Sequence, residues 1–203
     1  GAEGWHGWGG GGYELDDQVA HGGRHSARCD FQGADIQSGV YQHVTLNQTE
    51  PVAILARVWS RAENVTGAPN SDYSLYLDLE YTDGTPLWGQ TFAFSTGTHD
   101  WQQGTVLVMP AKPVKSLTVY GIFRNHEGRA WFDDFELYEM PGMRLFDLQA
   151  AGGELPAAGG AKWEPIALAE GCKVLLDPAT GAMSLDGGRR GGLVLRDAAA
   201  AGD

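Results

Sequence analysis

The chain has 203 residues and a formal net charge of −12, from 26 acidic and 14 basic side chains. Hydrophobic residues make up 42% of it, enough for a buried core, yet no apolar run approaches the ~20 residues that a transmembrane helix needs. The negative charge repels phosphate backbones and anionic lipids. We therefore expect neither nucleic acid as a partner nor insertion into a membrane.

Alternation of apolar and polar residues, bounded by turn residues, predicts eight strands with no helix between them. They span 26–31, 39–46, 52–61, 73–82, 87–95, 101–109, 115–124 and 129–138. Asp83-Gly84 is a hairpin signal between two of them. Short strands at this spacing predict an all-β fold, a β-sandwich of the jelly-roll type.

The composition changes after Met140, and residues 150–162 are almost all Ala, Gly and Pro. Such a stretch is too poor in large apolar groups to join a core, which predicts a linker over 141–162. Short apolar runs separated by turns then predict β-hairpins within 163–203. We expect a sandwich domain over 1–140 and the beginning of a following β domain over 163–203.

Cys29 and Cys172 are the only cysteines in the sequence. Two cysteines are too few for a disulfide framework or for a zinc site with four ligands, so the pattern favours buried free thiols. Whether the two could pair is left open by the sequence.

Successive side chains of a strand point to opposite faces, so odd- and even-numbered residues lie on different faces, a rule that we call strand parity. It places several aromatic side chains on polar faces of the predicted strands. Trp59 lies between Arg57 and Arg61, where it could pack beneath a loop or offer a stacking platform to a ligand. Tyr76 shares its polar face with Asp78 and Glu80. If these strands are neighbours, one outer sheet carries the candidate binding residues Trp59, Tyr76, Trp88, Gln90, Arg124 and Asn125.

Aromatic rings among amide, guanidinium and carboxylate groups suit a sugar, whose C–H faces stack while its hydroxyls hydrogen-bond. A face covered by a partner domain would show a similar mixture, and that alternative stays open. Trp101 and Trp131 are instead predicted to be core residues, because Trp131 shares its strand parity with Phe135 and Leu137.

Several motifs in residues 1–139 resemble the carbohydrate-binding modules of families four, nine and twenty-two. They are AEGWHGW, AHGGRHSARCDF, PVAILARVWSRA, GTHDWQ and WFDDFEL. The resemblance implies a galactose-binding-like sandwich that binds a polysaccharide or oligosaccharide without cleaving it. It further implies a secreted, extracellular bacterial protein, with adjacent domains that degrade the glycan.

The resemblance also implies a structural Ca²⁺, with Glu3, Gly23, Asp133 and Asp134 at the positions of its ligands. The parity of Asp133 points the same way, because an inward carboxylate needs a cation or several N–H donors. The alternative is that Asp133 and Asp134 accept backbone hydrogen bonds at a turn, without metal.

Two other functions are alternatives to glycan binding. A glycosidase could use Asp78 and Glu80, but carboxylates two apart on one strand face rarely flank a substrate bond. A structural or accessory domain could pack its aromatic face against a neighbouring catalytic domain, and the sequence barely separates this function from sugar binding.

Overall fold

The computed structural model describes residues 4–31 and 37–141, together with the strands 144–146, 173–176, 183–186 and 192–195. The chain forms two compact units, Gly1–Glu139 and Met140–Asp203. No helix in the described part of the chain is long and apolar enough to cross a membrane.

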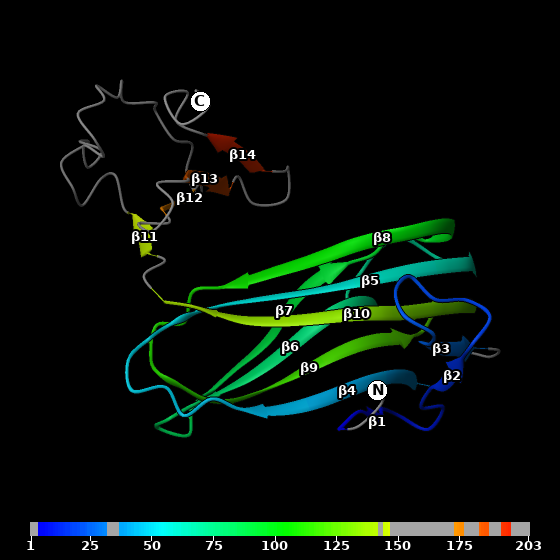
Figure 1. The fold of residues 1–203 in the computed structure, drawn as a ribbon, viewed down its shortest axis with the longest axis horizontal. Coiled ribbons are helices and arrows are strands. Elements are labelled where there is room, and N and C mark those ends of the chain that lie inside the picture. Colours follow the sequence, from blue (N-terminus) through cyan, green and yellow to red (C-terminus); the bar gives the residue numbers. More distant parts are fainter. Residues whose placement is uncertain are drawn as a thin grey trace. The chain divides into compact units, whose positions relative to one another are not determined.

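The first unit is a sandwich of two five-stranded sheets, whose strands are drawn in Figure 1. Sheet A has the order β1 (His6–Gly7), β4 (Gln37–Thr45), β9 (Val114–Arg124), β6 (Tyr73–Tyr81) and β7 (Pro86–Ala93). Sheet B has the order β2 (Glu14–Asp16), β3 (Ser26–Phe31), β10 (Gly128–Met140), β5 (Ala53–Val65) and β8 (Gly97–Val108). The all-β jelly-roll prediction is confirmed: all eight predicted strands form, and β1 and β2 are added to them.

The core lies between the sheets and follows the predicted alternation. On β5, Ile54, Ala56 and Val58 are buried, while the residues between them are half-buried on the outer face. Gly121 in the middle of β9 leaves room for the ring of Phe132 from the other sheet. A Cβ added to Gly121 would lie 2.7 Å from the ring of Phe132, so the glycine permits a close approach that no other residue would.

Cys29 is a buried free thiol, as the sequence predicted, and its burial raises the pKa of the thiol. Cys172 lies outside the described residues.

The prediction of a core residue is confirmed for Trp131, which is 3% exposed, and is wrong for Trp101. Trp101 has the parity of the exposed residue Gln103, and its ring packs edge-on against His21 at 5.4 Å between centroids. Trp131 is buried, and the guanidinium groups of Arg61 and Arg129 lie over its ring. A bulge that follows in β10 reverses the strand parity, so Trp131 does not share a face with Phe135.

The second unit contains one four-stranded antiparallel sheet in the order β11 (Arg144–Phe146), β12 (Lys173–Leu176), β13 (Met183–Asp186) and β14 (Gly192–Leu195). Three of these strands form where the apolar runs after residue 163 predicted hairpins.

Candidate functional site

The outer face of sheet A carries a row of tyrosines across three neighbouring strands. Tyr41 on β4, Tyr120 on β9 and Tyr76 on β6 are direct cross-strand partners. Their ring centroids are 5.7 Å apart for Tyr41 and Tyr120 and 5.9 Å apart for Tyr76 and Tyr120. We call these three residues the aromatic row. His6 on β1 extends the row at 5.5 Å from Tyr41, and Trp8 contacts the edge of Tyr120 at 6.3 Å.

The hydroxyls of Tyr76 and Tyr120 stay protonated at neutral pH. Burial raises the pKa of Tyr76 and of Tyr120, and the carboxylate of Asp78 raises both further. Each phenol can therefore donate as well as accept a hydrogen bond to a ligand.

A second row, one step along the strands, is polar. His43 on β4, Thr118 on β9 and Asp78 on β6 are again cross-strand partners. His43 Nδ1 lies 3.1 Å from Thr118 Oγ1, and Asp78 Oδ1 accepts the N–H of Gly89 at 3.0 Å. We call His43, Thr118 and Asp78 the polar row. Ring edges and hydrogen-bonding groups thus lie side by side on one face.

Trp88 completes this face at the edge strand β7. The register between β6 and β7 shifts between Leu77 and Leu79, which leaves Trp88 and Gly89 opposite the single residue Asp78. Gly89 takes a φ of +71° in this bulge, a conformation that favours glycine. The bulge leaves the Trp88 side chain 70% exposed. A shallow depression of about 440 Å³ lies between Trp88, the polar row and Tyr120.

The residues predicted to bind carbohydrate divide between two sheets. Tyr76, Trp88, Gln90 and Arg124 lie on sheet A, and Asn125 follows β9 directly. Trp59 lies on β5 in sheet B, so the expectation that it shares a sheet with the others is wrong. Strand parity gives the face of a strand but not the sheet that the strand joins.

Three of the predicted residues are engaged within the fold. Asp72 accepts hydrogen bonds from Arg124 Nε at 2.5 Å and from Asn125 Nδ2 at 3.0 Å. The amide of Gln90 donates to the carbonyl of Trp88 at 3.0 Å. The face of Trp59 is also occupied, because the ring of His21 stacks on it at 4.1 Å with an interplanar angle of 16°.

The residues predicted to bind carbohydrate did not include Tyr41, Tyr120, His43 or Thr118. The parity that placed Arg124 on the outer face of its strand also applies to Tyr120 and Thr118, so that signal was present. The sequence carries no signal for the pairing of β4 with β9, because the paired residues lie more than 70 positions apart.

Asp133 and Asp134 form a bulge in β10 that holds the loop before β3. Asp133 Oδ2 accepts the backbone N–H groups of His21 at 2.8 Å and of Gly22 at 3.1 Å, and Asp133 Oδ1 accepts that of Asp134 at 2.8 Å. Asp134 has a φ of +49°, and its Oδ2 lies 2.7 Å from His21 Nδ1. These contacts match the alternative in which the two carboxylates accept backbone hydrogen bonds at a turn.

The positions predicted to hold calcium lie only partly within the described residues. Among residues 4–31 and 37–141, no group of three or more His, Cys, Asp or Glu side chains is placed to hold a metal ion. Gly23 lies in the loop beside Asp134, and Glu3 lies outside the described residues. In the structure the partners of the Asp133 carboxylate are N–H donors of the loop.

No protein-family model matches the chain. The tRNA nuclease WapA of Bacillus subtilis strain 168 is 31% identical to it over 103 residues, which are 48% of this chain and 4% of that protein. The chain therefore corresponds to a small part of the curated relatives that it matches.

Two solved structures share the fold. The CBM22-1–GH10 modules of Clostridium thermocellum endo-1,4-β-D-xylanase 10B, complexed with xylohexaose, match with a TM-score of 0.50 and 13% identity over 67% of this chain and 26% of that chain. The enzymatically active domain of bacteriophage CBA120 tailspike protein 4 matches with a TM-score of 0.53 and 7% identity over 68% of this chain and 20% of that chain. At these identities the likeness is one of fold, a β-sandwich of the kind found in carbohydrate-binding modules.

Proposed function

We propose that residues 1–140 are a non-catalytic carbohydrate-binding module of the family four, nine and twenty-two type. Its ligand lies on the outer face of sheet A, and it holds a polysaccharide-degrading enzyme on its substrate. The observation that carries this proposal is the adjacency of the aromatic row, the polar row and the 70% exposed Trp88 on one face.

The chemistry of this face matches that of a saccharide. The indole plane of Trp88 can stack on the C–H face of a pyranose ring, while the phenols of the aromatic row and the polar row meet its hydroxyls. Neighbouring strands are ~4.8 Å apart, so an oligosaccharide lying across the strands would meet β7, β6, β9 and β4 in turn. The xylanase modules that share this fold in part are complexed with xylohexaose, which supports the choice of a glycan as the ligand to test.

A hydrolytic role for Asp78 and Glu80 has less support. The Glu80 carboxylate is paired with Lys115 Nζ at 2.8 Å, and Asp78 accepts the amide of Gly89. Both side chains rise from one face of one strand, whereas glycosidic carboxylates flank the bond that they cleave.

The alternative function is that of a structural domain whose aromatic face packs against a neighbouring catalytic domain. The exposure of Trp88 would suit such a protein partner as well. Binding of a free oligosaccharide separates the two functions, because a buried domain interface has no reason to bind sugar.

The test is titration of the chain with xylohexaose and a panel of plant, algal and bacterial polysaccharides. We expect a dissociation constant of about 10 μM to 1 mM, since each ring contact contributes about 1 kcal/mol. Trp88→Ala should weaken binding about 5- to 30-fold. The matched control is Trp59→Ala on sheet B, which should leave the affinity unchanged. Absence of binding across the whole panel would reject the proposal.

We propose a structural Ca²⁺ at Glu3, Gly23, Asp133 and Asp134 on the basis of the resemblance. If it binds, addition of Ca²⁺ raises the melting temperature and a chelator lowers it again. If neither Ca²⁺ nor the chelator changes the melting temperature, no calcium is bound there. The partners of Asp133 are then the N–H groups of His21 and Gly22. An extracellular location is proposed on the same basis, from the glycan that the fold would bind.

A further inference from the structure

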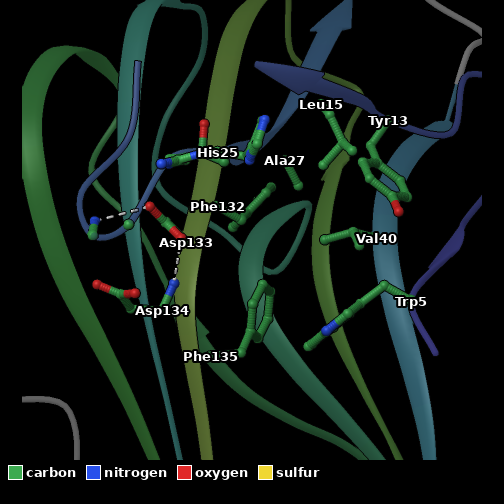
Figure 2. A pocket seen from close by; sticks show the side chains of 14 residues that line it. Trp5, Tyr13, Leu15, His25, Ala27, Val40, Phe132, Asp133, Asp134 and Phe135 are labelled. Atoms are coloured by element: carbon green, nitrogen blue, oxygen red, sulfur yellow. Dashed lines mark hydrogen bonds between the residues drawn. The ribbon is translucent and has the colours of Figure 1, made fainter. Parts of the chain in front are cut away.

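A second cavity, separate from the face of sheet A, lies between the N-terminal segment and the bulge of β10 (Figure 2). It has a volume of about 420 Å³, within the range of small-molecule sites. Its floor consists of Ala27, Val40 and Phe132, which belong to the buried core. The rings of Trp5 and Phe135, 4.4 Å apart between centroids, form one wall.

The cavity leaves apolar surface uncovered. Leu15 on the edge strand β2 pairs with Ala27 and therefore faces the same side of sheet B as the core. Its side chain nevertheless stays 55% exposed, because it lines the open cavity instead of packing against sheet A. Tyr13, also on the lining, adds a fourth ring to those of Trp5, Phe132 and Phe135. A ligand that covered these groups would remove apolar area from water.

The charged groups around the cavity are not equivalent. Asp133 and Asp134 are compensated by the N–H groups and the ring of His21 and its neighbour Gly22. Arg24 and His25 also line the cavity and are exposed, and neither side chain forms a hydrogen bond or ion pair with any residue that the structure describes. The groups that remain available to a ligand are thus a guanidinium and an imidazole.

We propose that this cavity binds a small aromatic carboxylic acid. Its ring lies over Phe132 beside Trp5 and Phe135, and its carboxylate is held by Arg24 with His25 next to it. A guanidinium binds a carboxylate through two parallel N–H bonds, which a neutral ligand cannot match. The net charge of −12 opposes an anion only weakly, because charges more than ~10 Å away are screened at physiological salt.

The ligand class also follows from what the floor lacks. The side chains of Ala27, Val40 and Phe132 carry no hydrogen-bonding group, so the hydroxyls of a sugar would be desolvated there without partners. The cavity shares no lining residue with the depression beside Trp88, and the proposal does not depend on glycan binding.

The test uses cinnamate and its neutral amide, cinnamamide, as a matched pair of probes for calorimetric titration of the full chain. We expect cinnamate to bind at least about five-fold more tightly than cinnamamide, the gain of about 1 kcal/mol from one exposed charge pair. Arg24→Gln should abolish this preference, and Arg24→Lys should retain part of it. Leu15→Trp, which fills the mouth of the cavity without changing the core, should weaken both probes.

Trp88→Ala serves as the control and should change neither affinity. The proposal is overturned if cinnamate does not bind, if the two probes bind equally, or if a correctly folded Leu15→Trp variant, with an unchanged melting temperature, still binds both as the parent does.

Discussion

Asp16 illustrates how a single carboxylate fastens the N-terminal segment to sheet B. It accepts the indole N–H of Trp131 at 2.9 Å and the backbone N–H groups of Gln18 at 2.8 Å and Val19 at 3.1 Å, and it pairs with Arg28. Burial by itself would raise the pKa of Asp16, but these donors outweigh it and lower the pKa to about 2.

The depressed pKa of Asp16 makes part of the stability dependent on pH. The group is ionised more readily in the folded than in the unfolded chain, so its contribution is complete above pH ~4 and is lost as the pH falls from ~4 to ~2. We expect this loss to be about 2 kcal/mol in the free energy of unfolding. Urea denaturation at pH 6 and pH 3 should show roughly half of this loss, because pH 3 lies between the folded and unfolded pKa values.

Asp16→Asn is the matching variant. It should be less stable than the parent at pH 6 and should lose less stability between pH 6 and pH 3. A variant with the same pH dependence as the parent would show that other carboxylates, such as Asp72, carry the effect.

At the scale of the strand, sequence patterns predicted most of the faces and failed where a bulge intervenes. The alternation of Ile54, Ala56 and Val58 was enough to orient β5. The bulge at Asp134 reverses the parity of β10, and an extra residue beside Asp78 turns Trp88 outward on β7. Both bulges depend on contacts with distant residues, so the alternation of apolar and polar residues along one strand cannot reveal them.

The loop before β3 fits the bulge of β10 tightly. A Cβ on Gly22 would lie 2.5 Å from Asp134 Oδ2, closer than real Cβ contacts allow. Gly22→Ala should therefore displace the bulge and reduce the free energy of unfolding by about 1–3 kcal/mol. Urea denaturation checks this.

Gly10→Ala is the control for that substitution, because nothing lies within 4 Å of its added Cβ. Its effect should stay within about 0.5 kcal/mol. If the two variants are equally stable, the loop does not rest on Asp134 as the structure describes.

At the scale of the whole chain, strand number and fold class could be predicted because they depend on local alternation and turns. The candidate site could be predicted only in part, because it depends on which strands pair. Tyr76 lies beside Tyr120 and Tyr41 through two long-range pairings, and Trp59 is removed from them because β5 joins the other sheet. Pairing between strands that are far apart in the chain leaves no periodic pattern in the sequence of either strand.

The described members of the buried core all lie between residues 27 and 132, within the first unit. A fragment of residues 1–141 should therefore fold alone and unfold in one cooperative transition by calorimetry. A fragment that is unfolded, or that melts without cooperativity, would mean that the domain boundary is misplaced.

The most direct test of glycan binding to sheet A follows the indole N–H signals of the tryptophans by NMR while an oligosaccharide that binds the chain is added. Trp88 and Trp8 report on the outer face of sheet A, and Trp59 and Trp101 report on that of sheet B. We predict that the signals of Trp88 and Trp8 shift in proportion to saturation while those of Trp59 and Trp101 stay in place. Shifts confined to Trp59 and Trp101 would contradict the assignment of the binding face.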